Sequence, residues 1–197
     1  MDTEYYLKHC TKENFIGRGS TRKAYKVDDM AVKIHLHPLG RRQSENERDI
    51  YQYMKGRGWH EYFAEVYYTD ETMSIQKYYP NLELIEGQSY ELNNRTHRDL
   101  LPEHYDEAVQ ILDETFDIFD IKESDNYGLN QDNKVVFIDY GMTKELYNSD
   151  WRPLAESGVL PQVEFTTCTE CLREKEIRVY GTDTGRICAE CEERLNG

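Results

Sequence analysis

Four cysteines toward the end of the chain have the residue types and spacing to hold a metal ion. They form two C-x2-C pairs, CTEC at 168–171 and CAEC at 188–191, with sixteen residues between the pairs. Zinc binds thiolates in a tetrahedron of four ligands. Pairs with this separation are typical of zinc sites, although a redox dithiol or two disulfides remain alternatives. Four thiolates leave zinc no open position for a substrate, so we predict a structural zinc ion held by Cys168, Cys171, Cys188 and Cys191.

A short strand-turn-strand unit is predicted between the two cysteine pairs. The spacer contains EIRVYGTDTGRI at 176–187, in which two β-prone runs flank a glycine-containing turn. Such a hairpin brings the second pair back to the first. A segment this short needs a metal to fold, so we predict a zinc ribbon over residues 163–197. The stretch 152–165 carries two prolines and a glycine and is interpreted as the linker from a first domain over residues 1–155.

Near the N-terminus, two glycines lie where a phosphate could bind. Gly17 and Gly19 are one residue apart, and without a Cβ they let backbone N–H groups approach a phosphate. A lone pair of this kind is also common in ordinary turns. The glycines precede two strand-like segments, KAYKV at 23–27 and MAVKI at 30–34, joined by an acidic turn. The second segment contains Lys33, whose ammonium group is a candidate partner for the phosphates.

Oxygen ligands suited to magnesium follow further along the chain. The apolar, strand-like segment KVVFI at 134–138 ends at DYG, residues 139–141, and Asn126 lies thirteen residues before Asp139. Mg²⁺ takes hard oxygen ligands, one or two of them from the protein, and leaves the others to phosphates and water. Asn126 and Asp139 are therefore the candidate magnesium ligands. A turn at 130–133 is predicted to join the two strands between them.

The order of these features resembles that of the protein kinase family over residues 14–145. A glycine-containing turn, a hairpin with Lys33, an asparagine and an Asp-aromatic-Gly segment follow one another as they do in that family. The resemblance implies an α+β, protein-kinase-like fold with a β-rich N-lobe and a truncated C-lobe, plus the small zinc-ribbon module. The third glycine of the family's turn falls on Arg22, and no Ala-Pro-Glu or large helical half follows Gly141. The usual peptide-docking platform is therefore missing.

The resemblance also implies roles for single residues. Lys33 would meet the phosphates and pair with Glu47 from a predicted helix over 43–55, with Glu45 as a rival. The family's hinge, whose backbone holds adenine, falls on the predicted strand MSIQKYYP at 73–80, around Lys77 and Tyr78. The nucleotide-binding residues implied in this way are Gly17, Gly19, Lys33, Lys77, Tyr78, Asn126 and Asp139.

The segment DIK resembles part of the family's catalytic loop. Asp120 would accept the proton of the attacking hydroxyl, and Lys122 would steady the transferring phosphoryl group. The catalytic residues implied by the resemblance are Lys33, Glu47, Asp120 and Lys122.

This loop departs from the family in two ways. Ile118 and Phe119 replace His-Arg, and the step from Asp120 to Asn126 is six residues, one more than usual. Either the loop bulges by one residue, Asp125 takes the place of Asn126, or no base is correctly placed. Losing a general base costs about 10²–10⁴ in rate, so slow activity remains compatible with the sequence.

The sequence HRDL at 97–100 matches the start of the family's catalytic loop more closely, but it is not among the residues assigned to that loop above. If Asp99 were the catalytic base, the family would have asparagine where this chain has His104. The Asp-x-Gly segment also follows forty residues later, about twice the usual distance. Apolar spacing from about Pro102 predicts a helix instead. We interpret HRDL as a chance match before that helix, and Asp99 should tolerate substitution by Asn.

Two further patterns have weaker interpretations. His35 and His37 alternate on one strand and could share a metal ion, but no third ligand lies nearby in sequence. The ribbon could read nucleic acid, but the net charge of −14 disfavours a broad surface for phosphates, and acids surround its basic residues Arg173, Lys175, Arg178 and Arg186.

The polar, acidic first residues and the short apolar runs predict neither a signal peptide nor a membrane span, so a cytoplasmic protein is expected. We predict an ATP- and Mg²⁺-dependent phosphotransferase that acts on Ser/Thr or a small acceptor. Its zinc ribbon would dock a protein partner or the substrate. The alternative is a catalytically weak pseudokinase that acts as a protein-binding or regulatory module.

Overall fold

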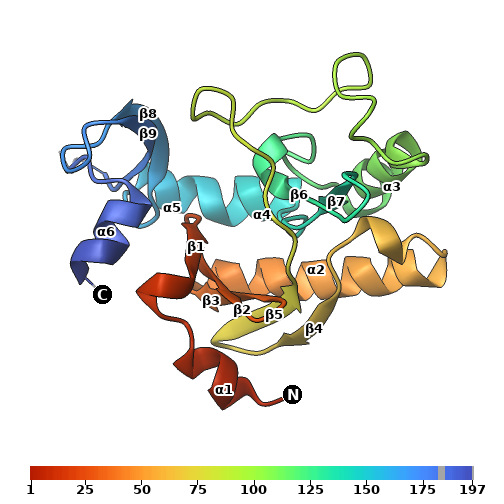
Figure 1. Cartoon of the computed structure of the whole chain (residues 1–197), viewed down its shortest axis with the longest axis horizontal. Helices are drawn as coiled ribbons and strands as arrows, with labels where there is room; N and C mark the ends of the chain where they lie inside the picture. The colour runs from red at the N-terminus through yellow and green to blue at the C-terminus, as the bar shows by residue number, and fades with distance from the viewer. Residues whose placement is uncertain (182–184, 197) are drawn as a thin grey trace.

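The computed structural model describes residues 1–181 and 185–196 and has a mixed α+β architecture (Figure 1). A five-stranded sheet near the N-terminus is followed by a part with helices and a short hairpin. A second small hairpin and a helix end the described chain. The long helix α2 (Pro38–Gly56) packs on the sheet and continues into the helical part. No helix among the described residues is both long and apolar enough to cross a membrane.

The sheet is antiparallel throughout, in the order β1-β2-β3-β5-β4. Successive side chains alternate between its faces, so Val32 of β3 joins an apolar cluster while Ala31 and Lys33 face a cavity on the other side. The register places Lys33 opposite Ala24 of β2 and Ser74 of β5. The strands are β1 (Phe15–Arg18), β2 (Arg22–Val27), β3 (Met30–His35), β4 (Val66–Thr69) and β5 (Met73–Lys77).

Helix α2 begins earlier than the helix predicted over 43–55, because its start is capped. The ring Nδ1 of His37 accepts the backbone N–H of Leu39 at 3.2 Å, and Pro38 suits the first turn of a helix. The buried side of α2 is mainly polar in its first half and apolar in its second half. The first half buries mainly polar groups against the sheet, and the second half buries Ile50, Tyr51 and Met54.

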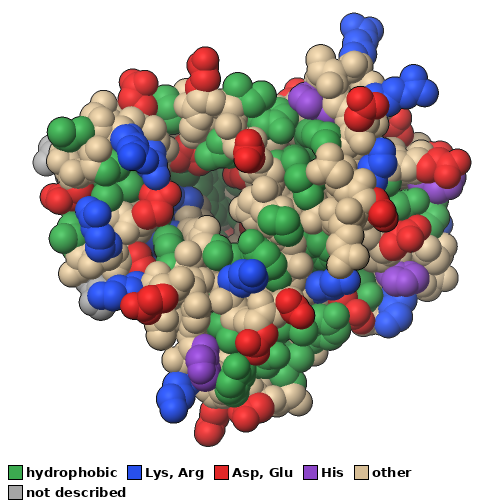
Figure 2. Space-filling model, in the orientation of Figure 1, with side chains coloured by type: hydrophobic (Ala, Val, Ile, Leu, Met, Phe, Trp, Pro, Cys, Tyr) green, Lys and Arg blue, Asp and Glu red, His purple; other side chains and the backbone are tan. Residues whose placement is uncertain are grey.

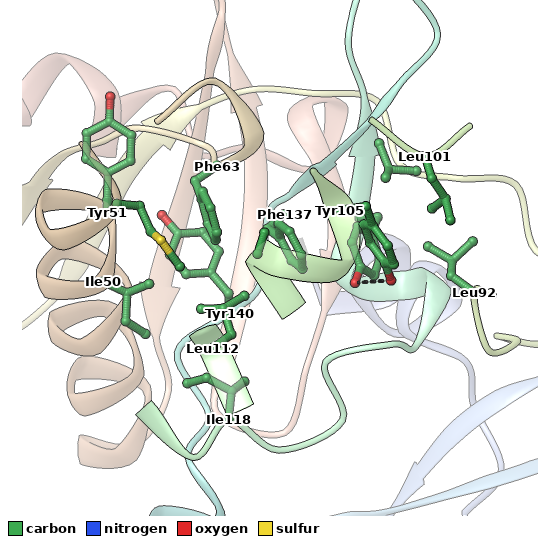
Figure 3. Close-up of a cluster of buried hydrophobic side chains, with 14 of the residues drawn as sticks. Ile50, Tyr51, Phe63, Leu92, Leu101, Tyr105, Leu112, Ile118, Phe137 and Tyr140 are labelled. Atoms are coloured by element: carbon green, nitrogen blue, oxygen red, sulfur yellow. Dashed lines mark hydrogen bonds between the residues drawn. The ribbon is translucent and has the colours of Figure 1, made fainter. Parts of the chain in front are cut away.

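A single apolar cluster ties this second half of α2 to the helical part (Figure 3). Phe63 stacks on Phe137 with ring centroids 4.8 Å apart, and both lie near Tyr140. The Tyr140 hydroxyl donates to the Ala64 carbonyl at 2.7 Å. Because Tyr140 is fixed in this core, the flanking residue Asp139 is held in place at the edge of the cavity.

The helical part contains the hairpin predicted between Asn126 and Asp139. β6 (Tyr127–Leu129) pairs with β7 (Val135–Phe137) around the turn at 130–133, which confirms that prediction. The segment 78–104, by contrast, contains only isolated bridges and turns, and it crosses the top of the molecule in Figure 1. The remaining elements here are α1 (Thr3–Lys8), α3 (Tyr105–Phe116), α4 (Lys144–Leu146), a π-helical turn (Tyr147–Trp151) and α5 (Arg152–Glu156).

The C-terminal module differs from the predicted hairpin. β9 (Glu174–Val179) pairs with β8 (Gln162–Thr167), which precedes the first cysteine pair, and residues 185–188 form no strand. Residues 182–184 of the predicted turn lie outside the described residues. The helix α6 (Ala189–Asn196) begins at the second cysteine pair.

The predicted linker over 152–165 is also largely structured. Helix α5 occupies its start and β8 its end. Ala155 and Leu160 are buried in a small cluster with Leu39 and Leu146. This apolar contact gives the stretch a fixed place on the first part of the chain, which its prolines and glycine did not indicate.

Candidate functional site

A cavity of about 870 Å³ lies between the polar face of the sheet, the segment 119–142 and the C-terminal module. Figure 2 shows a hollow between that module and the rest of the molecule, with acidic side chains at its rim. The candidate residues that line it are Gly17, Gly19, Lys33, Tyr78, Asp120, Asn126 and Asp139.

Lys33 is the centre of the buried polar network in this cavity. Its Nζ donates to both carboxylate oxygens of Glu47, at 3.0 and 3.2 Å, and to the carbonyl of Ile138 at 2.7 Å. Glu47 is fully buried, whereas the rival Glu45 pairs with Arg41 at 2.8 Å on the helix surface. Lys33 is therefore tied both to α2 and to the residue that precedes Asp139.

Arg22 also belongs to this network, a role that sequence reasoning missed. Its guanidinium contacts Glu47 at 3.0 Å and Asp139 at 2.5 Å and donates to the Ser44 hydroxyl at 3.1 Å. The side chain is only 5% exposed. An arginine at the position of the family's third glycine was the one available signal. A buried internal cation thus lies on the carboxylate that was predicted to bind magnesium.

The close approach of α2 depends on glycine in the DYG segment. A Cβ on Gly141 would lie 2.0 Å from the carbonyl oxygen of Gln43. Without that atom, Asn46 can donate its side-chain amide to the Gly141 carbonyl at 2.8 Å. The contact keeps Glu47 within reach of Lys33.

The charges of the network shift the ionisation of its members. Burial acts to raise the pKa of Asp139, but the cations Arg22 and Lys33 more than offset it, so the pKa lies below its usual value. Burial, with the nearby charge of Arg22, lowers the pKa of Lys33. Asp139 is therefore ionised at neutral pH.

Asp120 and Asn126 meet in the predicted catalytic loop and line the same cavity as Lys33. Asp120 takes a left-handed backbone conformation with φ 50°, and the Asn126 side chain donates to its carbonyl at 2.9 Å. The backbone N–H groups of Ile138 and Asp139 donate to the Asn126 carbonyl, at 2.9 and 3.3 Å. The turn at Asp120 and these hydrogen bonds keep Asn126 beside the DYG segment.

Carboxylates gather around this loop. Desolvation, followed by the charges of Asp139 and Asp125, raises the pKa of Asp120 to about 8, although its side chain is exposed at the cavity rim. Desolvation, followed by the charges of Asp139 and Glu176, raises the pKa of Asp125 to about 6. A cluster of acids that resist ionising together is a place where a cation binds favourably.

Three candidates have other surroundings. Lys122 is exposed, lies 3.9 Å from Glu91 and lines a different cavity. The Lys77 side chain lies over the Tyr79 ring, and its backbone N–H donates to the Glu65 carbonyl. Tyr78 lines the main cavity, but its backbone N–H already donates to the Asp29 carbonyl at 2.9 Å. Neither backbone N–H is free for adenine.

HRDL lies in the turns before α3, and Asp99 does not line the cavity. The Asp99 carbonyl accepts a hydrogen bond from Lys134 at 2.7 Å. Helix α3 begins at Tyr105 rather than near Pro102.

The glycine turn is closed locally and open toward the cavity. The N–H of Gly19 donates to the Arg22 carbonyl at 2.8 Å. No atom lies within 4 Å of a Cβ built on Gly17, so a ligand can approach its backbone.

The four C-terminal cysteines form one cluster that fits zinc. Their sulfur atoms all lie within 4.8 Å of one another, and none is in a disulfide. A tetrahedron of zinc–sulfur bonds at 2.3 Å has edges of about 3.8 Å, and Cys171 and Cys188 are 4.0 Å apart. The backbone N–H of Cys188 donates to the Cys168 sulfur at 3.3 Å, as suits a thiolate. Zinc bound by these four thiolates would close the ribbon and would have no open coordination position.

The two histidines of the His-x-His pattern do not meet at a metal site. His37 caps α2, and the His35 ring lies 3.0 Å from the Ser44 hydroxyl. Within the described residues, the cysteine cluster is the only group of potential metal ligands of this kind.

The C-terminal module docks on the edge of the sheet that carries the glycine turn. Arg18 contacts Glu192 at 2.6 Å and donates to the Tyr180 hydroxyl at 2.9 Å. Lys23 contacts Glu193 at 2.6 Å. The module therefore forms part of the cavity wall.

No protein-family model matches this chain, and no curated protein matches it either. Among solved structures, the chain is similar to a pseudokinase in its apo form, with a TM-score of 0.35 and 18% sequence identity. The match covers 66% of this chain and 56% of that chain, so this chain spans little more than half the length of the pseudokinase. The function therefore has to be inferred from the residues of the cavity itself.

Proposed function

We propose that the cavity binds ATP with Mg²⁺ and that the chain is a protein-kinase-like phosphotransferase for a Ser/Thr or small-molecule hydroxyl. One observation carries the proposal: Lys33, which the buried Glu47 holds at 3.0 Å, lines the same cavity as the oxygen donors Asp120, Asn126 and Asp139. These groups are the ones that phosphoryl transfer needs, since it depends on positioning and charge neutralisation.

The cavity has separate surfaces for the base and the phosphates of a nucleotide. Ala24, Ala31 and Leu82 provide an apolar lining for a purine, and the open backbone of Gly17 lies beside it. Lys33, held by Glu47, supplies a fixed positive charge for the phosphates.

Asn126 and Asp139 fit a magnesium ion by their chemistry, because both offer hard oxygen atoms. Arg22 occupies one oxygen of Asp139, but the Asp139 side chain remains 42% exposed toward the cavity. Bound magnesium would neutralise charge on the transferring phosphate. Asp120, which lines the same cavity, would orient the acceptor hydroxyl and take its proton. A cation nearby lowers the pKa of Asp120 and so favours its basic form.

A second candidate function is a nucleotide-binding pseudokinase with a regulatory role. The contact between Arg22 and Asp139 favours it, because an internal cation already neutralises the predicted metal ligand. Lys122 also lies outside the cavity. In either case zinc is proposed to hold the ribbon together, and docking of a protein partner or substrate by the ribbon remains a prediction.

Thermal unfolding with and without Mg-ATP tests nucleotide binding. At a ligand concentration one hundred times Kd, the stabilisation is about 2.7 kcal/mol, or roughly 5–11 °C for a chain of this size. Lys33→Met should abolish the shift. An unchanged melting temperature of the wild-type protein at saturating Mg-ATP contradicts both nucleotide hypotheses.

Transfer of labelled γ-phosphate, including autophosphorylation, separates the two candidates. The phosphotransferase hypothesis expects transfer by the wild-type chain and about a 10²–10⁴-fold loss in Asp120→Asn, with the Mg-ATP melting shift retained. If the shift is present but no transfer is detected, or if Asp120→Asn transfers as fast as wild type, the pseudokinase hypothesis is favoured.

A further inference from the structure

Two arginines from distant parts of the chain line the same wall of the cavity. Arg18 lies between the two glycines of the turn, and Arg178 lies on β9 of the zinc ribbon. The two charges are close enough that Arg18, after desolvation, contributes to lowering the pKa of Arg178. Two cations held near each other in a partly buried wall are unfavourable unless an anion joins them.

The partners of these two arginines differ. Arg18 is neutralised by Glu192. Arg178 makes no salt bridge with any carboxylate of residues 1–181 or 185–196, although Glu176 and Asp125 lie near enough to influence its charge. The Nε atoms of both arginines are buried and have no hydrogen-bond partner in the described part of the chain. Buried donors without partners are uncommon and costly.

We propose that Arg178 of the zinc ribbon is a ligand of the nucleotide's phosphates, acting beside Arg18 of the glycine turn. The inference rests on the proposed nucleotide function and adds to it a subsite for a triphosphate. A guanidinium presents a planar fork of N–H donors that matches phosphate oxygens. Arg18 fixes the location of the subsite, because Gly17 and Gly19 flank it in the turn whose backbone faces the cavity.

The same placement makes zinc part of nucleotide binding. β9 lies between Cys171 and Cys188, and zinc bound by the four cysteines would close that segment on itself. Loss of zinc would release Arg178 from the cavity wall without touching Lys33 or Asp139. The ribbon is then a wall of the binding site as well as a module for docking.

The test compares variants of the full, zinc-loaded chain by calorimetric titration with Mg-ATP and with adenosine. Arg178→Gln should weaken Mg-ATP binding roughly tenfold or more, because a charge-assisted hydrogen bond is lost, and should leave adenosine binding unchanged. Arg173→Gln is the matched control, since Arg173 is exposed on the same ribbon and does not line the cavity. It should bind both ligands as the wild type does.

Zinc content and melting temperature are measured for each variant. Arg178→Met, which keeps the aliphatic stem, replaces the Gln variant if that variant loses zinc. Loss of zinc by both variants overturns the proposal, because Arg178 is then a residue of ribbon structure. So does Mg-ATP binding within twofold of wild type, or an equal loss of adenosine binding. If the wild-type chain itself binds neither ligand, the proposed function fails, and this subsite fails with it.

Discussion

Replacing Arg22 with alanine is expected to destabilise the fold strongly and to change its response to magnesium. The guanidinium contacts Glu47 at 3.0 Å and Asp139 at 2.5 Å while 5% exposed. Its removal leaves Glu47 buried and Asp139 beside it, with Lys33 as the remaining cation of the network. Breaking a buried ionic network from one side costs about 3–5 kcal/mol, which corresponds to roughly 6–20 °C in Tm for a chain of this size.

Urea unfolding at neutral pH measures this loss, and Arg41→Ala provides the matched control. Arg41 also pairs with a glutamate of α2, but both side chains are at least 36% exposed, so its loss should cost about 0–1 kcal/mol. The stabilisation of each protein by Mg²⁺ gives a second readout, in which the variant should gain rather than lose relative to the wild type. With Arg22 removed, Asp139 is free of its internal cation, so Mg²⁺ should stabilise the Arg22→Ala variant more than the wild type.

The reasoning is refuted if Arg22→Ala and Arg41→Ala lose similar, small amounts of stability. In that case the Arg22 network does not hold α2 and the DYG segment together. If the stability falls as expected but Mg²⁺ stabilises the variant and the wild type equally, Arg22 does not limit the binding of Mg²⁺ by Asp139.

Other parts of the structure give three further predictions. The folded pKa of Asp120, about 8, exceeds the unfolded value of about 3.9, so its contribution to stability is full below about pH 4 and is lost as the pH rises to 8. Asp120→Asn should flatten this fall in the free energy of unfolding, measured with urea across that pH range. An unchanged pH profile contradicts the raised pKa. Gly141→Ala should cost about 1–3 kcal/mol by overpacking against Gln43, whereas Gly56→Ala, which meets no atom within 4 Å, should be neutral or slightly stabilising in the same assay. Cys188→Ser should abolish stoichiometric zinc in elemental analysis, whereas Cys10→Ser should retain it. Stoichiometric zinc in Cys188→Ser contradicts the prediction of a four-thiolate zinc site.

Local patterns in the sequence were sufficient to predict several elements. The alternating segments at 23–27 and 30–34 lie within β2 and β3, and the two strands around the turn at 130–133 pair as expected. These pairings join neighbouring residues, so strand propensity and turn chemistry decide them. The cysteine cluster was predictable for a similar reason, because ligand spacing constrains a tetrahedral metal directly.

Contacts across the chain were not predictable in the same way. Arg22 contacts Asp139 across 117 residues of sequence. Arg22 stands where the kinase family has the third glycine of its turn, and no local pattern shows that the arginine side chain is buried inside the protein. From the sequence, β9 could pair with the segment after the turn, at 185–187, or with the segment before the first cysteine pair. Its pairing with β8 depends on tertiary packing. Asp120 adopts a left-handed backbone conformation, and Lys122 lines a different cavity; neither feature is specified by the local sequence pattern.

The docking of α6 on the edge of the sheet has a consequence for how the chain folds. The hydrogen bond from Arg18 to Tyr180 spans 162 residues, and that from Lys23 to Glu193 spans 170. Contacts so distant in sequence close late and slowly, because the loop entropy must be lost before they form. On the ribosome, the strand with the glycine turn is made 162 to 170 residues before these partners. Until then β1 is an exposed sheet edge that other chains can join, so assistance by a chaperone during synthesis should matter most for this strand.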